Sequence, residues 1–400
     1  MQVQYRTDTK SGGELSALGM GCMRFSRTRT GQIDLDKTEA MLQSAVARGV
    51  NFFDTAYVYG GSEQALGEVF RRCPELREKM RVCTKLPFHL VKAYEDFDRL
   101  LDASMERMGI DCVDYYLIHN VTCEADWEGL RGLGAERWIA EKKAQGRIRR
   151  VGFSYHGSQA GFLALLEAYD WEITMIQYNY SDENYQAGRA GLKKAAEMGV
   201  PVVIMEPLLG GRLATGLPKQ AAVLLEQAAP GRSPANWALR WLLDQPEVTV
   251  VLSGMSSMEN LDDNINAANE ARPGCVTAAE REVYAQVVEM LRRAYKNPCT
   301  GCNYCLPCPK GINIPGCLSA YNASYAVDFF TGVQQYVTTT NLPDAVQHSS
   351  ARKCNGCGLC SKRCPQKIDV PAQLRRAARR LEPAPLRWGA RAFRRMQKIK

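Results

Sequence analysis

Eight cysteines near the C-terminal end stand in two motifs of nearly equal spacing. One motif reads C-x2-C-x2-C-x3-C-P, which is the ligand pattern of bacterial ferredoxins. The other differs only in its last gap, which is one residue shorter. Gaps of two residues let a tight loop direct three thiolates at one [4Fe–4S] cube, so the sequence predicts two such clusters. The candidate ligands are Cys354, Cys357, Cys360 and Cys364 in the regular motif and Cys299, Cys302, Cys305 and Cys308 in the shortened one.

The cysteine that precedes proline in each motif is expected to bind the cluster of the other motif. This rule assigns Cys364 to the cluster of the shortened motif and Cys308 to the cluster of the regular one. Two zinc sites, each with four cysteine ligands, are the alternative, although zinc usually takes paired cysteines and not triplets. The shortened gap leaves two further alternatives open: Cys317 as a ligand in place of Cys308, and a module that holds one cluster only.

A second group of reactive side chains lies in the N-terminal half. Asp54, Tyr59, Lys85 and His119 each end or follow an apolar run. A tyrosine hydroxyl has an ordinary pKa of about 10, and a nearby ammonium such as that of Lys85 lowers it. Asp54 can pair with that ammonium, and His119 can orient a substrate oxygen or assist proton transfer. A tyrosine tuned in this way can protonate a carbonyl oxygen while a hydride is delivered to the carbonyl carbon.

Elements far apart in the sequence must bring these four residues together. Up to about residue 295, apolar runs alternate with amphipathic segments, as in parallel strands covered by helices. Eight such units predict an α/β fold, the (β/α)8 TIM barrel, whose active site lies where the strands end. An open doubly wound sheet is the alternative, but residues 20–24 lack the Gly-rich turn expected after its first strand. The predicted strands are Ala17–Cys22, Val50–Asp54, Met80–Lys85, Val113–His119, Arg150–Ser154, Thr174–Asn179, Pro201–Glu206 and Val248–Ser253.

The predicted barrel resembles the aldo-keto reductase family over about residues 15–270. The resemblance is carried by GMGCMR at 19–24, DTAYVYG at 54–60, TK at 84–85 and IH at 118–119. It implies a catalytic tetrad in which Tyr59 is the general acid/base and Asp54, Lys85 and His119 complete the set. It also implies a nicotinamide cofactor, usually NADP, that lies extended along the barrel rim.

The resemblance also implies which positions contact the cofactor. Ser154 and Gln177 match the residues that hold the nicotinamide carboxamide, and residues 207–211 resemble the loop that covers the pyrophosphate. Met255 and Asn260 stand where the family often has Lys and Arg to grip a 2′-phosphate, so NADP and NAD both remain open. The implied cofactor contacts are Ser154, Gln177, Pro207, Leu208, Gly210, Ser253, Gly254, Asn260 and Asn264.

The length of 400 residues favours more than one domain. We predict a barrel over residues 1–296, a small, α-rich, ferredoxin-like iron–sulfur domain over 297–372, and a basic tail over 373–400. The second part resembles the ferredoxin-type domain that is appended to a subset of aldo-keto reductases. The insert at about 318–350 has no pattern that predicts its fold. The segment after Pro371 is predicted to form a basic helix, interrupted near Pro383 and Pro385.

The net charge of +8 is concentrated at the C-terminal end. Residues 375–400 include ten basic residues and one acidic residue, so the rest of the chain carries about −1. Such a nearly neutral body does not indicate a nucleic-acid-binding protein. Trp388, Phe393, Met396 and Ile399 stand among the arginines, so the tail is either an amphipathic helix for an anionic membrane surface or a solvated end. With no signal peptide and no apolar run of ~20 residues, we expect a cytoplasmic protein.

Together these features predict an NAD(P)-linked oxidoreductase that interconverts a small carbonyl compound and an alcohol. The clusters would serve structure, docking or electron exchange with a redox protein partner. Nicotinamide transfers a hydride whereas clusters transfer single electrons, and the sequence has no flavin motif to connect them. The alternative is an electron-transfer adaptor whose barrel binds a nucleotide or a redox partner without turnover. The complete tetrad favours the enzyme.

Overall fold

The computed structural model describes residues 2–340 and 349–384. Two compact units divide the chain. The first comprises residues 1–207 and 235–277, and the second comprises residues 208–234 and 278–400. The units therefore do not coincide with the boundary expected at residue 297, because the segment 208–234 and the helix that starts at residue 278 pack within the second unit.

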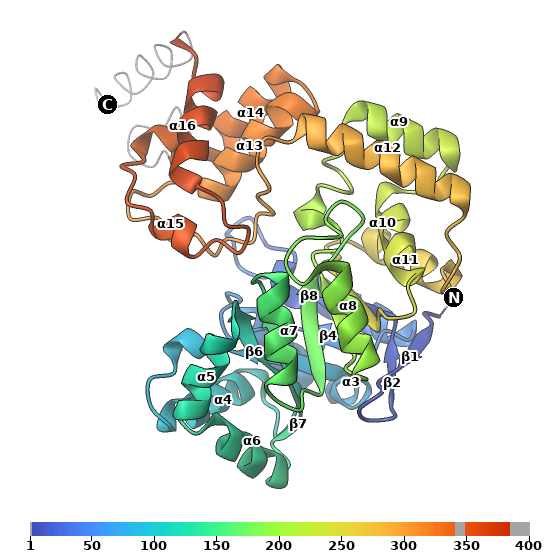
Figure 1. Cartoon of the computed structure of the whole chain (residues 1–400), viewed down its shortest axis with the longest axis vertical. Coiled ribbons are helices and arrows are strands. Elements are labelled where there is room, and N and C mark those ends of the chain that lie inside the picture. Colours follow the sequence, from blue (N-terminus) through green and yellow to red (C-terminus); the bar gives the residue numbers. More distant parts are fainter. Residues whose placement is uncertain (1, 341–348, 385–400) are drawn as a thin grey trace. The chain divides into compact units, whose positions relative to one another are not determined.

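The first unit contains a closed barrel of eight parallel strands, with β10 hydrogen-bonded to both β9 and β3 (Figure 1). Each of the eight predicted strands is present, and the (β/α)8 prediction is confirmed. The sequence signal was strong here because strands covered by helices on one side and by the barrel core on the other are apolar on both faces. The barrel strands are β3 (Leu18–Gly21), β4 (Phe52–Asp54), β5 (Arg81–Leu86), β6 (Val113–Val121), β7 (Ile148–Tyr155), β8 (Ile173–Gln177), β9 (Val202–Met205) and β10 (Val250–Ser253).

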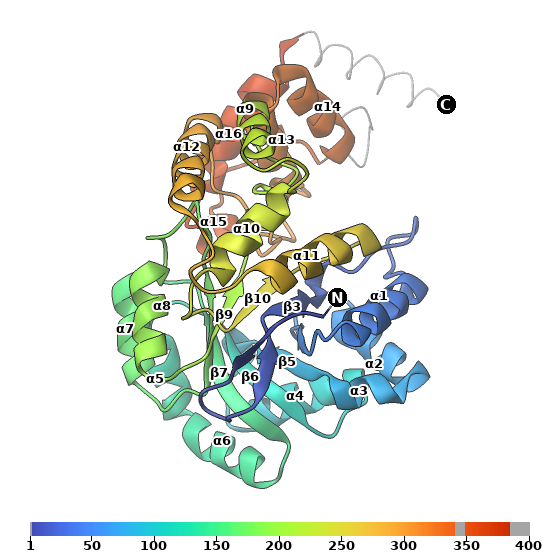
Figure 2. The same cartoon turned by 90° about the vertical axis from the view of Figure 1, so that its right-hand side faces the viewer.

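Helices surround this barrel (Figure 2). In the helix Glu95–Met108, for example, the buried residues recur at intervals of three and four, and Gly109 ends the helix in a left-handed conformation. The helices of this unit are α1 (Leu35–Ala47), α2 (Ser62–Arg72), α3 (Pro74–Lys79), α4 (Glu95–Met108), α5 (Glu124–Gly132), α6 (Ala135–Ala144), α7 (Gln159–Glu167), α8 (Gly188–Glu197), α10 (Pro234–Leu243) and α11 (Met258–Glu270), with short 3-10 turns η1 (Cys22–Arg24) and η2 (Phe88–Leu90).

A short hairpin of β1 (Tyr5–Thr7) and β2 (Glu14–Ser16) precedes the barrel, and the sequence did not predict it (Figure 1). Its strands are too short for an alternating pattern to stand out. Leu15 of this hairpin packs into the apolar cluster inside the barrel. The hairpin therefore closes the N-terminal end of the strands, which is the end opposite the expected active site.

The barrel interior is apolar near its N-terminal end and polar where the strands end. Alternate residues of a strand point to the same side. The buried apolar cluster includes Phe52, Cys83, Leu117 and Met175. The residues two positions further along the same strands are the buried polar side chains Asp54, Lys85, His119 and Gln177. The strand period therefore places these four side chains in one layer at the C-terminal rim.

The second unit is helical, and two of its helices explain the insert between the cysteine motifs. Residues 318–340 of that insert continue α13 and form α14, which pack on each other and on α16 (Figure 1). The predicted basic helix after Pro371 is present as α16, while its expected interruption reaches into residues outside the described part. The elements are η3 (Leu209–Gly211), α9 (Lys219–Ala228), α12 (Ala278–Ala294), α13 (Ile314–Ala326), α14 (Phe329–Thr340), η4 (Ala351–Lys353), α15 (Leu359–Lys362) and α16 (Val370–Leu381).

Membrane contact by the tail remains a prediction. Among the residues that the structure describes, no helix has the length and apolar character needed to cross a membrane. Trp388, Phe393, Met396 and Ile399, on which the membrane-surface hypothesis depends, lie outside the described residues.

Candidate functional site

The structure brings the four residues of the predicted tetrad together at the C-terminal rim of the barrel. Asp54 ends β4, Lys85 and His119 lie in β5 and β6, and Tyr59 lies in the loop between β4 and α2. The Lys85 Nζ is 2.5 Å from the Asp54 Oδ1 and 2.6 Å from the carbonyl oxygen of Thr55. The same Nζ is 4.9 Å from the centre of the Tyr59 ring. The Tyr59 ring in turn meets the His119 imidazole edge-on at a centroid distance of 5.9 Å.

Tyr59 is less buried than the other three residues of the tetrad. Asp54, Lys85 and His119 are all at least 95% buried, whereas Tyr59 is half-buried. An isolated ammonium in such a place would be costly, and the short contact with Asp54 offsets the burial of Lys85. The hydroxyl-bearing residue is thus the member of the group that a molecule arriving from solvent can reach.

A hydrogen-bond network that the sequence did not reveal holds the Tyr59 loop. The Thr55 and Ser62 hydroxyls are 2.8 Å apart, and the Ser62 hydroxyl donates to the carbonyl oxygen of Cys22. Within the loop, the Tyr59 amide donates to the carbonyl of Ala56. These bonds tie the loop to the rim around η1, so the position of Tyr59 is fixed by residues outside the tetrad.

A buried carboxylate bonded to Thr84 provides a second anchor. Glu63 accepts a hydrogen bond of 2.7 Å from the Thr84 hydroxyl and pairs with Arg107 at 3.0 Å. Arg107 also donates to the carbonyl oxygen of Tyr57 and stacks on its ring at 4.1 Å. The segment 55–63 is therefore bonded to β5 and to α4 at once. The only sequence signal for this network was the position of Thr84 and Glu63 beside the tetrad motifs.

The electrostatic state of the tetrad follows from burial. Burial raises the pKa of Asp54, and the Lys85 ammonium acts in the opposite direction. Burial, followed by the nearby Lys85 charge, holds the pKa of His119 well below its ordinary value. His119 is therefore a neutral imidazole at pH 7, which can both donate and accept a hydrogen bond.

The depressed pKa of His119 should make the barrel less stable in mild acid. Below about pH 6.5 the unfolded chain binds a proton at this histidine and the folded chain does not. The cost approaches ~1.4 kcal/mol for each pH unit below that value. In His119→Gln, the loss of unfolding free energy between pH 7.5 and pH 5.5 should be smaller than in the wild type. Urea unfolding followed by tryptophan fluorescence measures it, with the exposed His89→Gln as control; equal losses in both variants would contradict the assignment.

Two of the predicted nicotinamide contacts lie at the same rim as the tetrad. The Ser154 hydroxyl, near the end of β7, accepts a hydrogen bond of 2.8 Å from the amide of Asn120. Gln177 ends β8, where its side chain donates to Asp182 and accepts from Gln186 at 3.1 Å. Both side chains are buried and held in place.

Asn120 is a candidate contact that the sequence analysis missed. It follows His119 and has a φ of 63°, a conformation that asparagine tolerates better than most residues. Its side-chain Oδ1 is buried without a hydrogen-bond donor among the described residues. A buried acceptor beside Ser154 suits a ligand that brings an N–H group, such as a carboxamide. The left-handed conformation was the feature that a sequence alone could not indicate.

The predicted adenosine contacts lie after β10. The Ser253 hydroxyl accepts a hydrogen bond of 2.6 Å from the Asn264 side chain. Asn260 lies in the first turn of α11, where its amide bonds to the N-cap Ser257. Gly254 lies beside Arg24: a Cβ at Gly254 would be 3.8 Å from the Arg24 side chain. Arg24 therefore places a cation near this end of the rim, although Met255 and Asn260 supply none.

The predicted pyrophosphate loop spans the division between the units in sequence. Pro207 belongs to the first unit, whereas Leu208 and Gly210 belong to the second. There the loop packs on the first cysteine motif. A Cβ at Gly210, whose φ is 66°, would lie 1.8 Å from the carbonyl oxygen of Thr300, so only glycine fits. The Tyr295 hydroxyl also bonds to the carbonyl oxygen of Gly216.

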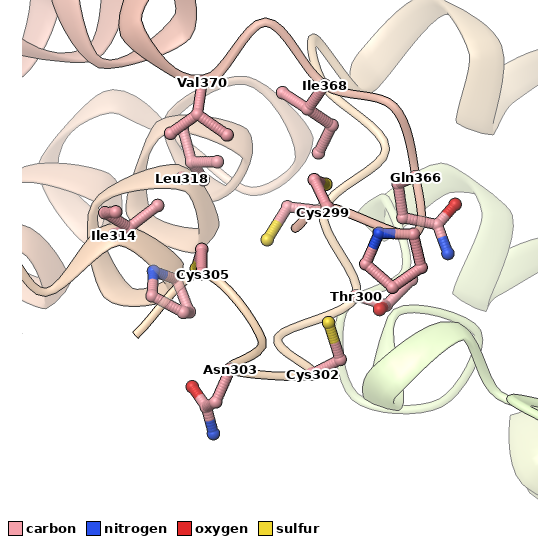
Figure 3. Close-up of a pocket in the computed structure, with 13 residues that line it drawn as sticks. Cys299, Thr300, Cys302, Asn303, Cys305, Ile314, Leu318, Gln366, Ile368 and Val370 are labelled. Carbon is pink, nitrogen blue, oxygen red and sulfur yellow. The ribbon is translucent and has the colours of Figure 1, made fainter. Parts of the chain in front are cut away.

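Four of the predicted cluster ligands line one cavity in the second unit. Figure 3 shows Cys299, Cys302 and Cys305 along one loop, and Cys364 lines the same cavity from the other motif. Among the described residues, no three His, Cys, Asp or Glu side chains are close enough to hold one metal ion. These four thiols instead surround a space. The apolar wall of the cavity is formed by Ile314, Leu318, Ile368 and Val370.

The remaining predicted ligands lie around the second cysteine loop. Burial raises the pKa of Cys360, and Cys354 and Cys308 are close enough to add to that increase. Cys308 therefore lies near the second motif, as the crossed assignment expects. Cys317, the alternative ligand, is in the helical core, where its thiol faces the carbonyl oxygen of Ser349 at 3.8 Å. Burial raises the pKa of Cys317 to about 12.

Sequence comparisons match two parts of the chain to known protein families. Residues 17–273 match the aldo/keto reductase family, and residues 298–369 match the 4Fe-4S dicluster domain. L-glyceraldehyde 3-phosphate reductase of Escherichia coli (strain K12) is 26% identical over 314 residues, covering 67% of this chain and 88% of the relative. The uncharacterized oxidoreductase YrpG of Bacillus subtilis (strain 168) is 26% identical over 310 residues, covering 66% and 91%.

Solved structures share the fold of the first part. The holo form of aldo-keto reductase AKR11C1 from Bacillus halodurans superposes with a TM-score of 0.58 at 24% identity, covering 72% of this chain and 96% of the other. A putative aldo-keto reductase from Pseudomonas aeruginosa gives a TM-score of 0.51 at 24% identity, covering 66% and 94%. At 24% identity, the similarity to these two structures shows a shared fold.

Proposed function

Given that the chain belongs to the aldo/keto reductase family and has a C-terminal 4Fe-4S dicluster domain, we propose that it interconverts a small carbonyl compound and an alcohol with NADP or NAD. The observation that carries the proposal is the convergence of Asp54, Tyr59, Lys85 and His119 at the C-terminal rim of the barrel. A barrel built only for binding would not need a buried ammonium beside a half-buried tyrosine.

Each residue of the tetrad has a role that its surroundings support. The nicotinamide, when bound, supplies a hydride to the carbonyl carbon or accepts one from the alcohol carbon. The Tyr59 hydroxyl gives its proton to the carbonyl oxygen and recovers it from solvent; the reverse reaction runs the same steps backwards. The Lys85 ammonium stabilises the phenolate left behind, and Asp54 keeps that ammonium in place. Neutral His119 orients the carbonyl oxygen towards Tyr59.

The proposed cofactor contacts suit the chemistry of a nicotinamide nucleotide. Ser154, Gln177 and the buried acceptor of Asn120 offer hydrogen bonds to a carboxamide. Ser253, Gly254, Asn260 and Asn264 are proposed for the adenosine end, with Pro207, Leu208 and Gly210 at the pyrophosphate. Arg24 beside Gly254 offers one cation for a phosphate group, which is compatible with either nucleotide.

The proposed cluster ligands also suit a [4Fe–4S] cluster. Four thiols around an apolar-walled cavity fit a [4Fe–4S] cube, which is bound by four thiolates. We propose Cys299, Cys302, Cys305 and Cys364 for one cluster, and Cys308, Cys354, Cys357 and Cys360 for the other. The clusters, when bound, supply one-electron chemistry.

The test of this function is anaerobic purification with iron and sulfide analysis, followed by NADPH and NADH oxidation across a panel of small aldehydes and ketones. The proposal expects cluster absorbance and carbonyl-dependent oxidation of at least one nucleotide. Clusters without any carbonyl-dependent oxidation would instead support the electron-transfer adaptor.

Cysteine variants should separate the two candidates for the eighth cluster ligand. Cys308→Ala is expected to lower the iron content by about half, because one of two clusters loses a ligand. Cys317→Ala should keep the wild-type iron content, because Cys317 lies in the helical core with its own contact to Ser349. Iron and sulfide assays on anaerobic protein, with EPR of the reduced clusters, measure both. Loss of iron in Cys317→Ala alone would reverse the assignment.

A further inference from the structure

The two cysteine loops of the dicluster domain differ in their exposure. Of the eight proposed ligands, Cys357 is exposed and the other seven are partly buried. Leu359, two residues later, is 43% exposed at the start of α15. In the first loop, by contrast, Thr300 is buried and its carbonyl oxygen packs against Gly210. The second loop is therefore the one that presents its cluster ligand at the surface of this unit.

The second loop also lies in a basic stretch of the sequence. Residues 349–368 include five basic residues and no acidic residue. Lys362, Arg363 and Lys367 are exposed within this stretch, and we call these three residues the basic rim. The first cysteine loop, residues 298–312, has a single basic residue, Lys310. The basic residues are thus concentrated at the exposed second loop and not at the first cysteine loop.

The two acidic residues nearest to the basic rim along the chain form hydrogen bonds or ion pairs within the fold. Asp369 caps α16, because its carboxylate accepts a hydrogen bond from the amide of Ala372. Glu382 is buried and binds Arg352 at 2.9 Å and the hydroxyls of Tyr336 and Ser350. These carboxylates hold the fold together. Among the described residues, neither carboxylate is paired with a residue of the basic rim.

The helix α16 adds further exposed basic residues. Its apolar side, which includes Leu374 and Leu381, is buried in the helical core. Arg375, Arg376 and Arg379 of the same helix are exposed. The helix contacts η4, which precedes the second cysteine motif, and α15, which contains Cys360. Basic side chains therefore continue from the rim along the neighbouring helix.

We propose that the basic rim around Cys357 and Leu359 is the docking surface for an acidic one-electron carrier protein. The proposal rests on the cluster ligation of the second motif given above and deepens it by naming the partner class. Opposite charges steer the carrier to the surface, and the exposed Leu359 of the same loop offers an apolar contact. One electron passes from the reduced carrier to the oxidised second cluster, or back, with no bond made or broken. An exposed cluster ligand in the same loop as the basic rim favours a redox partner over other polyanions.

The test is stopped-flow electron transfer to the oxidised full-length holoprotein. The probe is a dithionite-reduced acidic [2Fe–2S] ferredoxin, freed of excess reductant. The variant reverses the charge of the whole rim: K362E, R363E and K367E. A matched triple variant, K193E, K219E and R292E, makes the same change in net charge at exposed positions outside the rim. At low ionic strength the rim variant should lower the second-order rate constant at least about tenfold, whereas the matched variant should change it far less. The wild-type rate should also fall as salt is added.

The EPR spectrum of the reduced clusters and the iron content must match the wild type in both variants, which separates lost docking from lost clusters. Equal rates in the two triple variants would overturn the proposal. It would also be overturned if the rim variant lost binding to phosphatidylglycerol vesicles or to duplex DNA while electron transfer stayed unchanged. Carbonyl-dependent NADPH oxidation, measured on the same preparations, reports on the proposed function separately, because failure there leaves the transfer rates unaffected.

Discussion

Replacing Tyr59 with Phe is expected to lower kcat/KM for carbonyl reduction by about 10²–10⁴-fold, because the proposed proton donor to the carbonyl oxygen is lost. The phenyl ring keeps the packing of the site: it can still lie 4.9 Å from the Lys85 Nζ and meet the His119 imidazole edge-on. Nucleotide affinity should therefore change little, since the proposed cofactor contacts are other residues. The loss should fall on kcat.

Two measurements make this expectation specific. NADPH fluorescence titration reports nucleotide binding, and steady-state kinetics with the best carbonyl of the panel report turnover. Tyr94→Phe is the matched control, because Tyr94 precedes α4 and its hydroxyl bonds to Glu141 of α6 on the exposed outer surface of the barrel. That variant should retain wild-type kinetics. Full turnover by Tyr59→Phe would falsify the assignment of Tyr59 as the acid/base.

The barrel and the layer that holds the candidate catalytic residues were predictable because two simple periodicities coincide. Strands buried on both faces appear as apolar runs, and the alternation within each run places every second residue inside the barrel. Where the run ends in a polar residue of the inward set, as at Asp54 and Lys85, that residue must lie in the rim layer. The position of a residue along its strand was therefore the main feature from which the site could be predicted.

The organisation of the second unit was not predictable, for two physical reasons. Helix α13 is buried over most of its circumference, including Asn322 and Ser324, so it shows no amphipathic stripe. The packing of α9 against α12 joins the segment 208–234 to residues 278–294, and contacts between segments so far apart leave no local pattern. The sequence did not predict the residues that support the site, such as Asn120 and Glu63, for a related reason. Their roles depend on contacts in the fold and not on spacing in the sequence.

The second large effect concerns the buried ion pair between Lys85 and Asp54. Lys85→Met removes the ammonium that lies 2.5 Å from the Asp54 carboxylate and leaves this carboxylate buried without its partner. Breaking a buried pair from one side typically costs about 3–5 kcal/mol of unfolding free energy. Carbonyl reduction should be lost as well. The double variant Asp54→Asn with Lys85→Met has no unpaired charge and should regain much of the stability, but none of the activity.

The pH dependence of the single variant distinguishes an unpaired carboxylate from a simple packing defect. Burial already raises the pKa of Asp54, and removing the opposing Lys85 charge raises it further. A carboxyl group with a raised pKa binds a proton more readily when folded than when unfolded, so its penalty is small in acid and grows as the pH rises. The deficit of Lys85→Met relative to wild type should therefore be larger at pH 8 than at pH 5.

Urea unfolding at the two pH values measures this deficit. Tryptophan fluorescence reports on the barrel, because Trp127, Trp138, Trp171, Trp237 and Trp241 are all buried in the first unit. The double variant is the control, because it shares the loss of the Lys85 charge, and with it any effect on His119, but has no buried carboxylate. A deficit in Lys85→Met that is the same at both pH values, and equal to that of the double variant, would mean that lost packing alone accounts for it. In that case Asp54 would not depend on Lys85 for its charge.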